Sequence, residues 1–226
     1  METEKKILLD VFDNLGLQNN NGSERNTLKA EQLITFVSMI QKWNKTYNLT
    51  ALKNVADMVS HHIIDSLAVI PNLNAYFLQK KISFPNILDV GTGAGLPGVV
   101  LAIMQSKYNI CCLDAVEKKV AFLTSVKGQI GLSNLTVKHA RVESLEAQKV
   151  DIVISRAFAS IVDIVELTQK HVSSGGSIVA MKANGIEKEI MALRQRQSQW
   201  NVKAIDSLNV PGSNATRCLV WLQKEQ

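Results

Sequence analysis

A glycine-rich segment near the middle of the chain has the residue types of a nucleotide-binding turn. It runs from Asp89 to Gly98, DVGTGAGLPG, and an apolar stretch at residues 99–104 follows it. Gly91, Gly93 and Gly95 permit positive φ angles and let a ligand approach the backbone closely. Because a strand is predicted before this turn and a helix after it, a nucleotide cofactor is the expected ligand.

Two carboxylates near the turn help to identify that ligand. Asp114 ends the next apolar run, where it could accept hydrogen bonds from ribose hydroxyls. Asp89 at the mouth of the turn would repel a pyrophosphate, but it suits a ligand with an ammonium and a sulfonium, such as S-adenosylmethionine. An alternative is that Asp89 only caps the turn. Residues 93–98 also satisfy the dinucleotide fingerprint, so a nicotinamide-dependent oxidoreductase remains a second hypothesis.

The surrounding sequence predicts an α/β fold. Apolar residues recur at helical spacing in residues 33–43 and again in 59–70, where the segment 71–74 is expected to close the helix. From Ile82 onward, β-branched runs alternate with helical segments, which predicts a parallel sheet covered on both faces. The seven expected strands are residues 87–90, 109–113, 135–137, 151–154, 177–181, 202–205 and 218–222.

The predicted organisation is a Rossmann-like domain at residues 81–226, preceded by an N-terminal helical extension at residues 1–80. The last two strands should be antiparallel, since no helix fits between them. The chain has 226 residues, three cysteines and a net charge of +5. These values favour a cytoplasmic protein without a disulfide framework, and they mildly favour a polyanionic partner. No cysteine or histidine spacing indicates a metal site.

Five segments, in this order, resemble the bacterial small-subunit (16S) ribosomal RNA guanine-N7 methyltransferases, also called the glucose-inhibited division protein B family. The resemblance covers most of the chain and implies a class I methyltransferase fold with S-adenosylmethionine as cofactor. This chain has Ala94 where the family commonly has Pro, and Lys182-Ala183 where it often has Lys-Gly. The five segments are WNKTYNLT (43–50), HIIDSL (62–67), DVGTGAGLPG (89–98), RVE (141–143) and ISRAFA (154–159).

The resemblance also assigns residues to the cofactor site. It implies that Gly91 and Leu96 line this site, that Val142 and Glu143 sit beside the adenine, and that Arg156 completes the pocket. A physical interpretation agrees, because Glu143 follows the third predicted strand and Arg156 ends the fourth. The expected cofactor-binding residues are therefore Asp89, Gly91, Gly93, Gly95, Leu96, Asp114, Val142, Glu143 and Arg156.

Each residue assigned by resemblance has a plainer structural interpretation. Val142 could be a core residue, and Glu143 could cap a surface helix. Arg156 could form an ion pair with Asp151 or Asp163. His62 and Asp65 are interpreted as joining the N-terminal helices to the sheet, because no third ligand suggests a metal.

The implied acceptor, guanine N7, carries a free lone pair and loses no proton when it is methylated. No general base is therefore expected, and no catalytic residue is assigned. Lys45 and Arg156 are predicted to contact RNA, and Trp43 and Tyr47 could stack a base, although Trp43 also continues a helical stripe. The expected partner of a monomeric protein is the small-subunit RNA or the small ribosomal subunit. A non-catalytic RNA-binding assembly factor is the third hypothesis.

Overall fold

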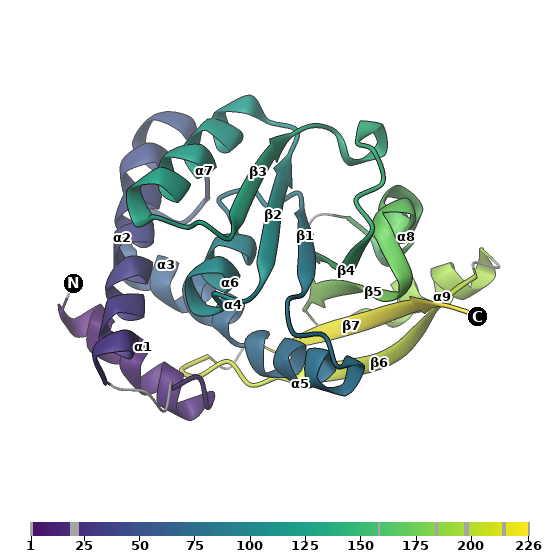
Figure 1. Ribbon diagram of the computed structural model, residues 1–226, viewed down its shortest axis with the longest axis horizontal. Helices are drawn as coiled ribbons and strands as arrows, with labels where there is room; N and C mark the ends of the chain where they lie inside the picture. Colours follow the sequence, from purple (N-terminus) through teal and green to yellow (C-terminus); the bar gives the residue numbers. More distant parts are fainter. Residues whose placement is uncertain are drawn as a thin grey trace.

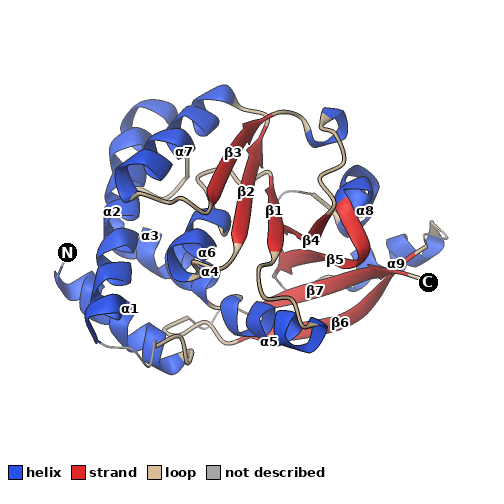
Figure 2. Cartoon of the chain, viewed as in Figure 1, coloured by secondary structure: helices blue, strands red, loops and turns tan. Residues whose placement is uncertain are grey.

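Seven strands form one mixed sheet in the described part of the chain, with the order β3-β2-β1-β4-β5-β7-β6 (Figures 1 and 2). The structure is a computed structural model that describes residues 2–18, 23–157, 159–183, 185–196, 199–213 and 216–225. All seven predicted strands are confirmed. They are β1 Asn86–Val90, β2 Asn109–Asp114, β3 Leu135–His139, β4 Val150–Arg156, β5 Val172–Lys182, β6 Trp200–Leu208 and β7 Arg217–Lys224.

The strand directions place the candidate residues at one edge of the sheet. Strands β1 to β5 pair in parallel, and β7 is antiparallel to both β5 and β6, as predicted for the last pair. The strand order reverses between β1 and β4, and ligands of such sheets bind beyond the carboxyl ends of the strands at this point. The glycine turn, Asp114 and Arg156 follow or end β1, β2 and β4, so all three lie at this edge.

Six helical elements precede β1 within residues 2–18 and 23–85. They are α1 Glu2–Asn14, α2 Ser23–Tyr47, α3 Val55–Met58, the π-helix η1 Val59–Ile64, α4 Asp65–Leu67 and α5 Ile70–Lys80. The prediction that residues 71–74 close a helix is wrong, because Pro71 lies in the first turn of α5. Proline is tolerated there, since its fixed φ suits a helix and the N–H that it lacks would have no intrahelical partner.

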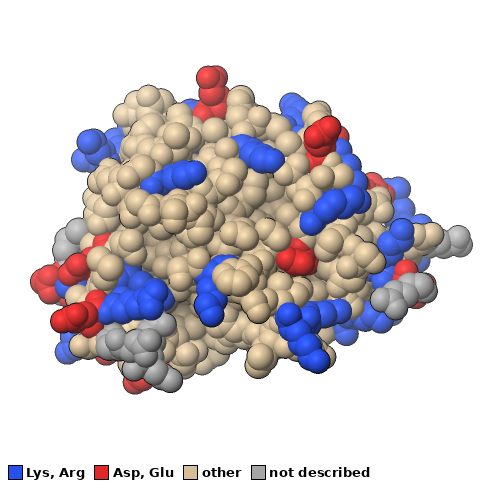
Figure 3. All heavy atoms as spheres, in the orientation of Figure 1, with Lys and Arg blue, Asp and Glu red and all other residues tan. Residues whose placement is uncertain are grey.

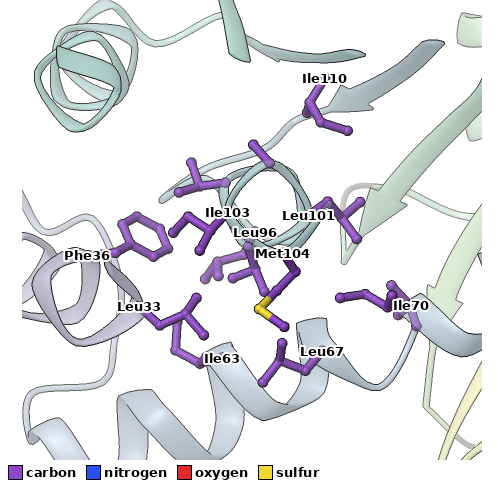
Figure 4. Close-up of a cluster of buried hydrophobic side chains, with 14 of the residues drawn as sticks. Leu33, Phe36, Ile63, Leu67, Ile70, Leu96, Leu101, Ile103, Met104 and Ile110 are labelled. Atoms are coloured by element: carbon purple, nitrogen blue, oxygen red, sulfur yellow. The ribbon is translucent and has the colours of Figure 1, made fainter. Parts of the chain in front are cut away.

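The N-terminal helices share one apolar core with a face of the sheet. On this face lie α6 Gly98–Met104 and α7 Glu117–Ile130. Leu33 of α2 and Leu67 of α4 point toward Leu96, in the turn before α6, and Met104, the last residue of α6, and all four side chains are buried (Figure 4). Fully burying one such side chain contributes about 1.5–3 kcal/mol, so this contact fixes the extension against the glycine turn.

The opposite face of the sheet is covered only in part. Helices α8 Ile161–Thr168 and α9 Glu187–Gln195 pack there, and a second apolar cluster fills the space between them and the sheet. The crossover from β3 to β4 carries one short 3-10 helix, η2 Val142–Ser144, where a parallel crossover usually carries an α-helix (Figure 1). A hollow of about 470 Å³ therefore remains beside β2 and β3, with Cys111 and Thr136 in its lining.

Helices thus lie on both faces of the sheet, as predicted, but on this face none of the described α-helices covers β2 and β3. The crossover segment, residues 140–149, has no apolar stripe of helical spacing that could cover the strands. No helix in the described ranges is long and apolar enough to cross a bilayer.

Candidate functional site

The glycine turn connects β1 to α6, and its glycines have different surroundings. Gly91, Gly93 and Gly95 have φ angles of 64°, 60° and 90°, which other residues rarely adopt. A Cβ atom on Gly93 would have only the Gly91 carbonyl oxygen within 4 Å, at 3.9 Å, so this part of the turn is open to a ligand. A Cβ atom on Gly95 would lie 2.6 Å from Val99 and 2.7 Å from Leu123, so Gly95 permits close packing on α6 and α7.

Asp89 is fully buried beneath the turn. Its Oδ2 accepts hydrogen bonds from Thr92 Oγ1 at 2.6 Å and from the backbone N–H of Gly98 at 2.8 Å. These bonds match the turn-capping interpretation. Its Oδ1, however, is buried and has no hydrogen-bond partner among the described residues. Burial raises the pKa of Asp89 to about 6, although the bonds from Thr92 and Gly98 oppose this shift.

Asp114 connects the end of β2 to the glycine turn. Its Oδ2 accepts from the N–H of Gly93 and its Oδ1 from the N–H of Val116, both at 2.9 Å, and Lys119 Nζ lies 3.7 Å from Oδ2. The side chain is 6% exposed. A buried carboxylate with these fixed donors keeps its orientation, and it retains lone pairs for further hydrogen bonds.

Asp114 also lines a cavity of about 410 Å³, here called the Asp114 cavity. Gly91, Val142 and Glu143 contribute to its walls. Val142 is buried in η2 and also belongs to the second apolar cluster, so its core interpretation and its site interpretation are compatible. The Glu143 carboxylate is exposed and lies 3.8 Å from the guanidinium of Arg141. Glu143 therefore meets the cavity at its solvent edge.

A larger cavity of about 570 Å³, here called the Arg156 cavity, lies beside the first. The turn contributes Gly91, Thr92, Gly93, Ala94 and Leu96, and the N-terminal part contributes residues 49–52, His61, His62 and Asp65. Lys182 of β5 and Arg217 of β7 complete the polar lining. Gly91 and Ala157 line both cavities, so one elongated ligand could extend from one cavity into the other.

The predicted cofactor residues thus lie around two adjoining cavities, with two exceptions. Asp89 lies beneath the turn, and Gly95 lies within its packing against α7, so neither lines a cavity wall. Phe158, in the last of the five segments, lies outside the described residues.

Arg156 is held by the N-terminal part of the chain. Its Nη1 donates to the His61 carbonyl oxygen at 3.1 Å, and its Nη2 donates to His62 Nδ1 at 3.3 Å. The alternative of an ion pair with Asp151 or Asp163 is wrong, because these carboxylates accept from the Asn86 N–H and from Ser160 Oγ instead. Burial lowers the pKa of Arg156, whereas attraction to Asp65 and Asp89 raises it.

His62 is neutral in this arrangement. Burial, followed by repulsion from Arg156, lowers its pKa to about 4. Because Nδ1 accepts from Arg156, the proton is assigned to Nε2, which then donates to Thr50 Oγ1 at 2.7 Å. Asp65 Oδ2 lies 3.3 Å from Arg217 Nε. His62 and Asp65 therefore join the N-terminal part to β4 and β7, as the sequence analysis predicted.

The basic and aromatic cluster at the end of α2 divides into two parts. Lys45 is exposed and does not line the Arg156 cavity. The centroid of the Trp43 ring lies 5.5 Å from that of Phe122 in α7 and 5.2 Å from that of Tyr47. These contacts support the interpretation of Trp43 as a core residue. Asn44, which the sequence analysis did not single out, accepts from the N–H of Thr50 and donates to the Leu52 carbonyl, so it shapes one wall of the cavity.

The topology and the site together define the class. A mostly parallel seven-stranded sheet with β7 antiparallel, a glycine turn after β1 and an acid ending β2 make this chain a Rossmann-like class I methyltransferase fold. The ribosomal protein L11 methylase of Lactobacillus delbrueckii subsp. bulgaricus shares it, with a TM-score of 0.53 and 10% identity over 77% of this chain and 81% of that one. MtNAS in complex with MTA and tNA also shares it, with a TM-score of 0.58 and 12% identity over 91% and 79%.

The family follows from the sequence. The family model GidB, rRNA small subunit methyltransferase G, matches residues 29–220. A relative called ribosomal RNA small subunit methyltransferase G from Bordetella pertussis strain Tohama I is 44% identical over 199 residues, 88% of this chain and 86% of that protein. Another with this name, from Bordetella petrii, is 42% identical over 219 residues, 97% and 82%. The chain therefore belongs to the GidB family and is an S-adenosylmethionine-dependent methyltransferase.

This membership decides between the three hypotheses of the sequence analysis. The nicotinamide-dependent oxidoreductase and the non-catalytic assembly factor are both wrong, since the family is one of methyltransferases. The residues also fit the cofactor. Gly93 leaves its side of the turn open, and the unpaired, buried Asp89 Oδ1 provides negative charge beneath a turn that would hold a cation.

Proposed function

We propose that this protein transfers the methyl group of S-adenosylmethionine to N7 of a guanine in small-subunit (16S) ribosomal RNA. The observation that carries this proposal is the pair of cavities that meet at Gly91. The Asp114 cavity has a carboxylate and an apolar wall that suit a nucleoside. The Arg156 cavity is lined by arginines and is large enough for a purine base.

For the cofactor, we assign the adenosine part to the Asp114 cavity. Asp114 would accept from the ribose hydroxyls, with Val142 and Glu143 beside the adenine, and these contacts are supported by the lining of this cavity. Gly91, Gly93 and Leu96 would hold the methionine part, since they line the Arg156 cavity next to it. Asp89 and Gly95 would act from beneath by fixing the turn. When bound, S-adenosylmethionine supplies a methyl group on a positively charged sulfur.

For the acceptor, the chain needs to position the base rather than deprotonate it. Guanine N7 has a lone pair at neutral pH, so no base catalyst is required. The imidazole that accepts from Arg156, that of His62, has both nitrogens engaged, by Arg156 and by Thr50. The Arg156 cavity would therefore contribute alignment, which is a large part of the acceleration of such a displacement.

The proposal of an RNA partner rests on the basic side chains at the surface. Basic side chains are spread over the face drawn in Figure 3, rather than gathered in a single patch. Such a distribution suits contact with several phosphates of a folded RNA. We propose that Lys45 contacts the RNA backbone, that Arg156 acts at the base, and that the substrate is the small ribosomal subunit.

Four further assignments belong to this proposal. The protein would act as a monomer in the cytoplasm, where ribosomal subunits assemble. Residues 1–80 would form a helical extension, and residues 81–226 the cofactor-binding domain.

The test combines cofactor binding with mapping of the product. In calorimetric titration, S-adenosylmethionine should bind and NAD should not. Small subunits that lack the modification should then accept a labelled methyl group, and it should map to N7 of one guanine in 16S RNA. Subunits that already carry it serve as the control and should accept none. Transfer to another atom or another RNA would contradict the proposal.

The affinity for S-adenosylmethionine should depend on pH through Asp89. The pKa of Asp89 is about 6, so its carboxyl group is mostly protonated at pH 5 and mostly ionised at pH 7.5. A cationic ligand favours the ionised form, so the affinity should rise by up to about tenfold from pH 5 to pH 7.5. His62, with a pKa of about 4, stays neutral over this range. Calorimetry across these pH values measures the effect.

Asp89→Asn is the matched variant for this measurement. It should bind S-adenosylmethionine more weakly at pH 7.5, and its affinity should not change with pH. Asp13→Asn, which alters an exposed carboxylate of α1, should keep the wild-type pH dependence. An affinity of the wild-type protein that is flat between pH 5 and pH 7.5 would show that Asp89 does not sense the cofactor.

A further inference from the structure

The Arg156 cavity has an uneven set of polar groups. Its described lining includes three cationic side chains, those of Arg156, Lys182 and Arg217, but only one acidic side chain, that of Asp65. The charge of Lys182 is already matched, because its Nζ lies 2.8 Å from Glu189 Oε2 and donates to the Ala159 carbonyl oxygen. Asp65 is thus the one carboxylate that this cavity offers to a ligand.

Asp65 is held in a fixed place at the cavity wall. It begins α4 directly after the π-helix η1, and its backbone N–H donates to the His62 carbonyl oxygen. π-helical turns occur frequently at functional sites. Asp65 is only 6% exposed, and burying a carboxylate is costly unless its charge is paired and hydrogen-bonded.

The contact with Arg217 leaves much of the carboxylate free. The one hydrogen bond to the Asp65 carboxylate from the described residues is that of Arg217 Nε to Oδ2, at 3.3 Å. Arg217 Nη1 donates to its neighbour, the Thr216 carbonyl oxygen, rather than forming a second bond to Asp65. A carboxylate has about four acceptor positions, so Asp65 has capacity for two more donors.

A guanine presents two such donors. When its N7 faces a methyl donor, O6 lies on the same side, and the N1–H and the N2 amino group lie on the opposite edge. A carboxylate accepts both of these hydrogens at once. Adenine has an unprotonated N1 and no amino group at C2, so it would place a lone pair against the same carboxylate. Enzymes that act on extruded bases commonly identify them by this edge.

We infer that the Asp65 carboxylate, oriented by Arg217, recognises the N1–H and N2 amino group of the acceptor guanine and so determines the base specificity of the Arg156 cavity. This inference rests on the proposed function, since it requires a guanine in this cavity. Asp65 would be a specificity-determining residue, without a role in binding S-adenosylmethionine.

The test replaces the target guanine by inosine, which lacks the N2 amino group, in reconstituted small subunits. The wild-type protein should methylate guanine with a kcat/KM about 10- to 100-fold above that for inosine, the range for one hydrogen bond to a charged group. Asp65→Asn should reduce this ratio to about threefold or less while binding S-adenosylmethionine with unchanged affinity. Arg217→Gln removes the ion pair but keeps the carboxylate, so it should preserve the preference at a lower rate.

The outcomes separate this inference from the proposed function. If the wild-type protein methylates neither substrate, the proposed function fails. If it methylates guanine but has no preference over inosine, or if Asp65→Asn keeps the preference, the assignment of Asp65 is wrong. A loss of preference in both variants would assign it to the ion pair, which also overturns the inference. If Asp65→Asn does not bind S-adenosylmethionine, Asp65→Ser replaces it in the same measurement.

Discussion

We expect Arg156→Ala to lower the kcat/KM of RNA methylation by about 100-fold. Arg156 donates to the His61 carbonyl and to His62 Nδ1, and its charge faces Asp65 and Asp89. Its removal leaves the His61 carbonyl and His62 Nδ1 without their donor and takes away the charge that faces the two carboxylates, a loss of about 3 kcal/mol or more. Arg156→Lys should recover only part of the activity, because an ammonium cannot reproduce the two fixed directions of a guanidinium.

Two variants serve as controls for this prediction. Arg196→Ala removes an exposed arginine that lies 3.5 Å from Glu166, so methylation should stay within about twofold of the wild-type rate. Lys45→Gln should raise the KM for the small subunit by a few-fold without altering the affinity for S-adenosylmethionine. If Arg156→Ala methylates RNA at the wild-type rate, the proposed role of Arg156 at the acceptor base is wrong.

Gly98→Ala should destabilise the fold by about 1–3 kcal/mol, the range for added volume in a packed core. A Cβ atom on Gly98 would lie 2.4 Å from Cys112 Sγ, 2.7 Å from Asp89 Oδ2 and 3.2 Å from Asp89 Cβ. Both neighbours belong to buried strands, so β1, β2 or the start of α6 must move. Urea unfolding measures the change, and the affinity for S-adenosylmethionine should fall with it, because Asp89 and the glycine turn shift together.

Gly128→Ala is the matched control for this substitution. Gly128 lies in α7, where a Cβ atom would meet nothing within 4 Å. Alanine has the higher helix propensity, so this variant should be more stable than the wild-type protein by up to about 1 kcal/mol. Equal unfolding midpoints for the two variants would show that α6 does not pack as closely on the sheet as the structure indicates.

The strands could be predicted because their signals are local. Each has a β-branched run, and the turn after β1 has its glycines in sequence. Strand β5, by contrast, begins at Val172, five residues before the predicted start. The segment Ser173–Gly176 has the composition of a turn, and only the pairing of Val172 with Val150 of β4 makes it part of the sheet. The π-helix η1 has no local signal either, since its residues fit an ordinary helical stripe.

The same distinction applies to the site. Asp89, Asp114 and the glycine turn lie within 26 residues of sequence and could be identified together. Arg217 could not be identified, because it lies 152 residues from Asp65 in the sequence. The two residues meet only because the sheet topology places β7 beside β5. Asn44, Thr50 and Thr92 lie inside the quoted segments, but their roles depend on hydrogen bonds that only the folded chain reveals. Local chemistry therefore indicated the glycine turn and the Asp114 cavity, whereas only the tertiary structure brought Asn44, Thr50 and Arg217 to the Arg156 cavity.

The missing crossover helix has a practical consequence for measurement. It leaves Cys111 half-buried in the hollow beside β2 and β3, whereas Cys112 and Cys218 are buried. Burial raises the pKa of the Cys111 thiol, so a maleimide dye should attach there in mildly alkaline buffer. Cys111 does not line the Arg156 cavity or the Asp114 cavity. A single fluorophore at this position would therefore label the protein without occupying either binding cavity.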